Sequence, residues 1–104
     1  MEYQISVYAL CEPGTDIVRY IGQSTNVPQR YQYHINSLGA AKTPCKRWIL
    51  RLKQQGLKPT LKVLEILPPD VPGWDAEYRW INLYLEQGAN LTNLHYLGAR
   101  KKVV

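Results

Sequence analysis

A phenol, a guanidinium and an imidazole lie within one short stretch of the chain, residues 20–34. Tyr20 is near the end of an extended segment, and a helix is expected to begin just past Asn26, a residue type that caps helices. Arg30 and His34 are four residues apart, so both side chains lie on one face of that helix. Phenol and imidazole groups can transfer protons, and a guanidinium binds oxyanions. The grouping therefore predicts a functional site.

A carboxylate occupies an unusual position in the last predicted helix. Glu77 shares a helical face with Ile81 and Tyr84, on a stripe that otherwise belongs to the interior. A buried carboxylate is costly unless it is paired or bound to a metal ion, which favours a second site residue. Glu77 also lies in the first turn, where the helix dipole favours an anion, so a structural role stays open.

The first two elements are predicted to be strands. Residues 3–11 alternate in polarity like a half-buried strand, and residues 17–22 predict a second strand after a turn at 12–16. The two should form an antiparallel hairpin. If the residues flanking the turn pair with each other, Tyr8 lies directly opposite Tyr20, with two phenols side by side on one face.

The rest of the chain completes a small layered domain. The remaining elements are expected as helices over 27–38 and 44–55, a strand over 59–67 and a helix over 74–87. The order strand, strand, helix, helix, strand, helix predicts an α+β fold, a three-stranded antiparallel sheet flanked by helices. We expect residues 1–97 to form this domain and residues 98–104 to be a basic tail.

The charge of the chain is unevenly distributed. The 104 residues carry a formal net charge of +5, yet no carboxylate occurs between Asp16 and Glu65, a span that holds nine lysines and arginines. A simple solvated surface would more often mix signs, so the pattern favours a polyanionic partner such as nucleic acid. Four of the basic residues lie on the second helix and are predicted to contact phosphates without reading sequence: Lys46, Arg47, Arg51 and Lys53.

Other classes of protein are disfavoured by the composition. Cys11 and Cys45 lack metal-ligand spacing and fall at apolar positions, which favours reduced core residues. The N-terminal residues show no signal-peptide pattern, and no apolar run is long enough to cross a bilayer. We therefore expect a cytoplasmic protein without a membrane partner.

The same residues, taken in order, match a known motif set. They are Ser6-Val7-Tyr8, Tyr20-Ile21-Gly22, Arg30, His34, Glu77 and Leu91-Thr92-Asn93. In type and order this set resembles the GIY-YIG nuclease superfamily, and the resemblance covers nearly the whole chain. Ser6 replaces the first glycine of the motif. Asn90 competes with Asn93 for the asparagine position, and Asn93 fits the family segment better.

The resemblance implies metal-assisted hydrolysis of phosphodiester bonds, most naturally in double-stranded DNA. Glu77 would hold Mg²⁺ or Mn²⁺, and one carboxylate with waters is typical of how Mg²⁺ is bound. One such centre nicks one strand, so a double-strand break would need a homodimer or two visits.

The resemblance also implies a role for each remaining site residue. Tyr8 is expected to be the general base, with Tyr20 in a supporting or exchangeable role. Arg30 would favour the phenolate and hold the phosphate, because it is permanently cationic. His34 would relay the proton or contact phosphate, and Asn93 would hold substrate or a neighbouring loop. A helix-surface histidine, a cross-strand tyrosine pair and a turn asparagine are the structural alternatives.

Two other functions stay open at this point. A catalytically inactive nucleic-acid-binding module would keep the basic surface without the chemistry. A structural domain with incidental charge would bind DNA weakly and without the steep salt dependence of a phosphate-binding surface.

Overall fold

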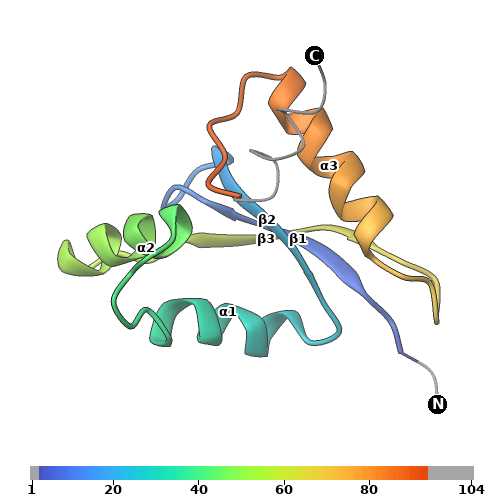
Figure 1. Cartoon of the computed structure of the whole chain (residues 1–104), viewed down its shortest axis with the longest axis horizontal. Coiled ribbons are helices and arrows are strands. Elements are labelled where there is room, and N and C mark those ends of the chain that lie inside the picture. The colour runs from blue at the N-terminus through green and yellow to red at the C-terminus, as the bar shows by residue number, and fades with distance from the viewer. Residues whose placement is uncertain (1–2, 94–104) are drawn as a thin grey trace.

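All six predicted elements are present, in the predicted order, in the computed structural model, which describes residues 3–93 (Figure 1). The elements are β1 (Ser6–Cys11), β2 (Val18–Ser24), α1 (Val27–Asn36), α2 (Pro44–Gln54), β3 (Thr60–Ile66) and α3 (Trp74–Glu86). The three strands form one antiparallel sheet, which confirms the predicted α+β fold. The predicted basic tail, residues 98–104, lies outside the described residues.

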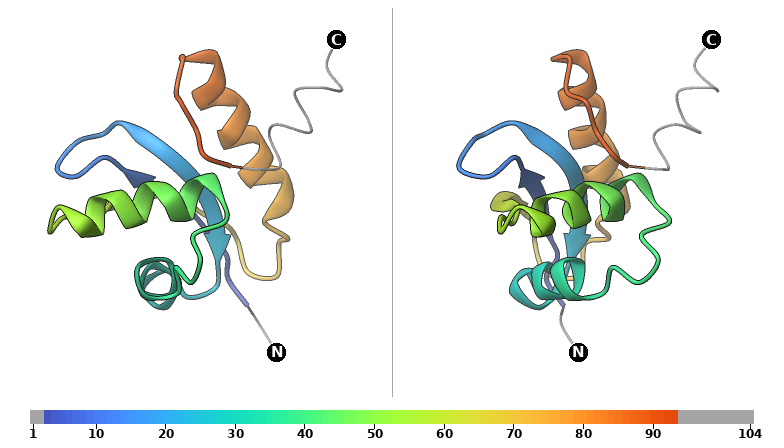
Figure 2. Two further views of the ribbon diagram at one scale, coloured as in Figure 1. Left: turned by 60° about the vertical axis from the view of Figure 1, so that its left-hand side comes forward. Right: turned by 90° about the vertical axis from the view of Figure 1, so that its left-hand side faces the viewer.

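The first strand is the centre of the sheet, whose strand order is β2-β1-β3. Helices cover both faces: α1 and α2 lie on one side, and α3 lies on the other (Figure 2). Five consecutive β1 residues, Val7 to Cys11, are at most 1% exposed. The prediction of a half-buried strand was therefore wrong, because a layer of helix packs on each side of β1.

Alternation along β1 divides its side chains between two apolar clusters. Val7 and Ala9 pack in the cluster beneath α3, together with Ile81. Tyr8 packs with the buried residues of α2, among them Trp48 and Ile49. The two cysteines are buried and free, one in each cluster. The side chain expected to do chemistry thus belongs to one of the two cores.

The register of the hairpin differs from the prediction. Tyr8 pairs with Gly22, and Tyr20 pairs with Leu10. The ladder has a bulge at Arg19, so Tyr20 lies diagonal to Tyr8 rather than opposite it. Both rings still face α1, with centroids 6.4 Å apart.

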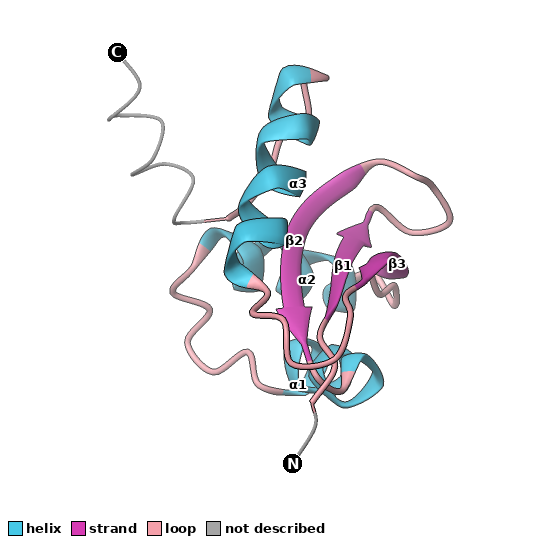
Figure 3. Cartoon of the chain, turned by 90° about the vertical axis from the view of Figure 1, so that its right-hand side faces the viewer, coloured by secondary structure: helices cyan, strands magenta, loops and turns pink. Residues whose placement is uncertain are grey.

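Glycine is required where β2 passes Tyr8. A Cβ atom at Gly22 would lie 2.6 Å from Tyr8 Oη, closer than side-chain atoms tolerate. The strand also continues beyond this glycine, further than predicted, because Gln23 and Ser24 pair with the start of β1. Gln23 is therefore a strand residue, and its side chain faces α3, because its amide bonds Glu77 of that helix. Figure 3 shows β2 running alongside α3.

Polar caps fix where the two site-bearing helices begin. Asn26 Oδ1 accepts a hydrogen bond from the backbone N–H of Gln29 at the start of α1. Thr43 Oγ1 does the same for Lys46 at the start of α2. Among residues 3–93, no helix has both the length and the apolar character needed to cross a membrane.

Candidate active site

Three aromatic side chains from three elements meet on the α1 side of the sheet. Tyr8 comes from β1, Tyr20 from β2 and His34 from α1. The His34 ring is 5.1 Å from that of Tyr20 and 5.9 Å from that of Tyr8, both in edge orientations. Tyr8 Oη lies 2.7 Å from His34 Nε2, a hydrogen-bond distance. The structure therefore brings together the two phenols and the imidazole identified from the sequence.

These three groups are electrically neutral at neutral pH. Burial, and after it the positive charges of Arg30 and Lys46, lower the pKa of His34 to about 4. Burial raises the pKa of Tyr20 to about 12. In the neutral tautomer that carries its proton on Nδ1, His34 accepts at Nε2, and Tyr8 then donates its hydroxyl proton to it.

The expectation that Arg30 makes Tyr8 a phenolate holds only in direction. The guanidinium does pull the pKa of Tyr8 down, but burial and the neighbouring Tyr20 outweigh it and hold that pKa far above its usual value. The reason is that Tyr8 is only 1% exposed, so its charged form loses most of its hydration. Tyr8 can act as a base only if it passes its own proton on.

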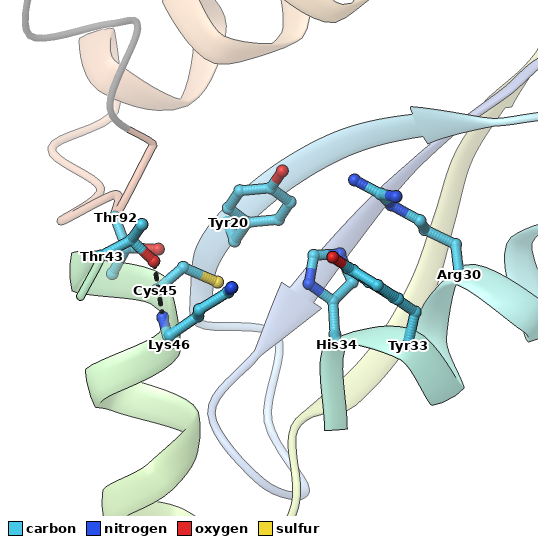
Figure 4. Close-up of a pocket in the computed structure, with 8 residues that line it drawn as sticks. All are labelled: Tyr20, Arg30, Tyr33, His34, Thr43, Cys45, Lys46 and Thr92. Atoms are coloured by element: carbon cyan, nitrogen blue, oxygen red, sulfur yellow. Dashed lines mark hydrogen bonds between the residues drawn. The ribbon is translucent and has the colours of Figure 1, made fainter. Parts of the chain in front are cut away.

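A pocket of about 260 Å³ opens between α1 and α2 beside these rings (Figure 4). Its lining residues are Tyr20, Arg30, Tyr33, His34, Thr43, Cys45, Lys46 and Thr92, and we call it the α1–α2 pocket. The Arg30 guanidinium lies 5.0 Å from the centre of the Tyr33 ring, a cation–π distance. No ion pair of Arg30 is present within residues 3–93, so its charge is available for an anion.

Glu77 lies on the opposite side of β2 from Tyr8, where its carboxylate contacts the end of that strand. Its Oε2 atom accepts a hydrogen bond of 2.9 Å from Gln23 Nε2. Burial and Cys45 raise the pKa of Tyr20 most, and the negative charge of Glu77 adds to that rise. Glu77 does not line the pocket beside the two phenols, and it reaches β2 from the α3 side.

Gln23 is a residue whose contact with Glu77 was not anticipated from the sequence. Its amide passes so close to Gly73 that a Cβ atom there would lie 2.0 Å from Gln23 Oε1. The amide is thus held between the start of α3 and the Glu77 carboxylate. Strand alternation places the side chain of Gln23 beside those of Val7 and Ile21 on the α3 face. If the second strand had been predicted to continue past Gly22, the same alternation would have indicated from the sequence that Gln23 faces α3.

The residues present suit one kind of metal ion. Across residues 3–93 there is no cluster of three histidine, cysteine or acidic side chains, which argues against a site of the zinc type. One oxygen of Glu77 is held by Gln23, and Oε1 makes no hydrogen bond within the described residues. A single carboxylate suits Mg²⁺ or Mn²⁺, which keep several waters and take other oxygens from phosphates.

Asn93 lies away from the substrate-accessible surface. Only 1% of it is exposed, and its Oδ1 and Nδ2 atoms bond the backbone N–H and C=O of Ile21 in β2. Of the two roles predicted for Asn93, the geometry favours holding a neighbouring segment over holding substrate. Asn90 is exposed and touches the sheet only through its backbone oxygen, which accepts from Arg19 Nε.

The four basic residues of α2 are not equivalent. Lys46 lines the α1–α2 pocket. Arg51 and Lys53 are exposed, and Arg47 is exposed with its guanidinium bonded to the backbone oxygen of Lys42. Three of the four therefore point to the outer surface, and one points into the site.

The comparisons with known proteins agree with this geometry. A family model described as the GIY-YIG catalytic domain matches residues 4–90, which is most of the chain. No curated protein and no solved structure matches it.

Proposed function

The chain belongs to the GIY-YIG nucleases, which act on nucleic acid, and we propose that it is an endonuclease that hydrolyses phosphodiester bonds of double-stranded DNA with Mg²⁺ or Mn²⁺. The observation that supports this most is the meeting of Tyr8, Tyr20 and His34 beside the pocket that Arg30 lines, with the carboxylate of Glu77 held by Gln23 on the other side of β2. Each chemical task of phosphodiester hydrolysis then has a candidate residue on or next to β2.

Arg30 binds the scissile phosphate. A guanidinium can donate two parallel hydrogen bonds to phosphate oxygens, and it stays charged throughout the reaction. The charge on those oxygens grows as the water attacks, so a fixed cation stabilises the transition state more than the ground state. Its cation–π contact with Tyr33 holds the guanidinium at the mouth of the pocket.

Tyr8 and His34 move the proton. As the oxygen of water attacks phosphorus, Tyr8 Oη takes a proton from that water and gives its own proton to His34 Nε2, 2.7 Å away. The bound phosphate supplies negative charge beside His34, which offsets Arg30 and raises the pKa of the imidazole toward a useful value. Tyr20, on the pocket wall, orients the same water.

Glu77 holds the cation, and Gln23 fixes the direction of the carboxylate. When bound there, a divalent cation supplies stabilisation of the negative charge that develops on the leaving 3′ oxygen and the phosphate oxygens. With one carboxylate and one such centre, the chain cuts one strand at a time. A double-strand break then requires a homodimer or two separate binding events.

A plasmid assay tests this function. Supercoiled DNA with Mg²⁺ or Mn²⁺ should become nicked circles before any linear product forms. Glu77→Gln and Arg30→Ala should each lower the nicking rate about 100-fold or more, by analogy with the loss of other transition-state contacts. Glu86→Gln, an exposed glutamate on the same helix, is the matched control.

The result that overturns the proposal is equally clear. If the unmodified protein binds DNA but no divalent cation produces nicks, the chain is a nucleic-acid-binding module without catalysis. If Glu77→Gln nicks as fast as Glu86→Gln, Glu77 has no part in the reaction.

A further inference from the structure

The α1–α2 pocket carries a cation on each of two opposite walls. Arg30 enters from α1 and reaches toward Tyr20, and Lys46 enters from the first turn of α2 and reaches toward His34 (Figure 4). None of the eight residues that line it in the described part of the chain is a carboxylate. Two fixed positive charges without a counterion make this pocket attractive to more than one anionic group.

Lys46 differs from the other basic residues of α2 in the groups that its charge reaches. After burial and Arg30, Lys46 is the third cause that lowers the pKa of His34. Burial raises the pKa of Cys45 to about 11, and Lys46 is among the charges that oppose this rise. These effects agree with the position of Lys46, whose side chain lines the pocket wall. Arg51 and Lys53 line no part of it.

We propose that the α1–α2 pocket binds two consecutive phosphates of the strand to be cut, with Arg30 on the scissile phosphate and Lys46 on its neighbour. This inference rests on the proposed function and assigns Lys46 a task separate from general attraction to DNA. Two anchored phosphates define the direction of the backbone, whereas one leaves the strand free to rotate about it. Lys46 therefore fixes the scissile phosphate against the Tyr8–His34 pair.

Binding of short oligonucleotides without any metal ion tests this directly. The probes are thymidine dinucleotides with no terminal phosphate, with a 5′ phosphate or with a 3′ phosphate, titrated while the imidazole signals are followed by NMR. The chain has two histidines, so a His34→Gln variant assigns the relevant signal. In the unmodified protein, one of the two terminal phosphates should tighten binding about tenfold and shift the His34 signal.

Two substitutions of Lys46 and one matched variant decide the result. Lys46→Met, which keeps the aliphatic stem, and Lys46→Ala should each abolish the tenfold advantage. Lys58→Ala removes an equal charge from the exposed loop that follows the same helix, so it should retain that advantage. The inference is wrong if neither terminal phosphate improves binding to the unmodified protein, or if the Lys46 variants keep the full advantage.

The outcome is separable from that of the plasmid assay, because no cleavage is involved. If the Lys46-dependent advantage is observed but DNA is never nicked, the two-phosphate site is supported and the proposed activity is rejected. If DNA is nicked at the same rate with and without the Lys46 side chain, the proposed activity is supported and the two-phosphate site is rejected.

Discussion

The hydrogen bond between Tyr8 and His34 joins a side chain of the apolar interior to one on the wall of the pocket. Tyr8 contributes a hydroxyl with almost no contact with solvent, and His34 contributes a nitrogen that burial keeps unprotonated. The hydroxyl and the imidazole nitrogen are hydrogen-bond partners of each other, which offsets the cost of removing these polar groups from water. The bond is a structural contact, and in the proposed mechanism it is also the path for a proton.

His34 should make the protein sensitive to mild acid. Its pKa falls from 6.5 to about 4 on folding, so between these values the unfolded chain binds a proton that the folded chain refuses. The free energy of unfolding should therefore decrease as pH falls from about 6.5 to about 4. Urea unfolding at several pH values should show this decrease in the unmodified protein and a smaller one in His34→Gln. Equal pH dependence in both proteins would contradict the lowered pKa.

Gln23 should govern metal affinity through Glu77. Gln23→Leu removes the amide that holds Glu77 Oε2, and Gly73→Ala pushes the same amide aside because the added Cβ occupies its place. Loss of such an outer contact typically weakens metal binding about 10- to 100-fold. Mn²⁺ binding in the presence of DNA, measured by electron paramagnetic resonance, should show this loss in both variants. Gln29→Leu, an exposed glutamine on α1, should bind Mn²⁺ normally.

At the scale of elements, β2 is the component around which the site is assembled. Its pocket-facing side carries Tyr20 and leaves room for Tyr8 at Gly22, and its α3-facing side carries Gln23. Residues 90–93 hold the outer edge of the strand, since Thr92 and Asn93 bond the backbone of Arg19 and Ile21.

Asn93 and Asn90 should therefore differ sharply on substitution. Asn93→Ala leaves the N–H and C=O of Ile21 without their buried partners, which should cost about 2–4 kcal/mol of unfolding free energy. Asn90→Ala keeps the backbone oxygen that accepts from Arg19, so its effect should stay within about 0.5 kcal/mol. Chemical denaturation of the two variants measures both. A costly Asn90→Ala beside a neutral Asn93→Ala would reverse the assignment of the motif asparagine.

The order of the elements could be predicted from sequence because periodicity and caps are local signals. Asn26, Thr43 and their prolines mark the helix starts within the chain itself. The register of the hairpin could not be predicted from local signals, since the bulge lies at Arg19, a residue that also contacts Asn90 and Thr92 far along the chain. The contact between Gln23 and Glu77 was missed for the same reason: it joins residues 54 positions apart.

At the scale of the whole molecule, one narrow sheet separates the two kinds of charge that the site uses. The α1–α2 side carries Arg30, Lys46 and the outward basic residues, and neither helix has an acidic residue in its first turn. The α3 side carries Glu77 within an acidic first turn. A DNA strand lying along α1 and α2 would meet the carboxylate only at the β2 edge.

The outward basic residues should determine affinity rather than chemistry. Replacing Arg47, Arg51 and Lys53 together by alanine should weaken DNA binding and make the plot of log affinity against log salt shallower by about three units. Fluorescence anisotropy with a labelled duplex at several salt concentrations measures this. At saturating DNA, the nicking rate of the triple variant should remain close to that of the unmodified protein. An unchanged slope would remove these residues from the DNA interface.

The burial of Tyr8 in the apolar cluster has a consequence for the timing of the reaction. Because burial raises the pKa of Tyr8, its hydroxyl stays protonated even in moderately alkaline solution. No phenolate is therefore present before substrate binds. If Tyr8 is the base, as proposed, it must release its own proton while it takes one from water, so the two transfers coincide. The arriving nucleic acid strand would then complete the catalytic arrangement.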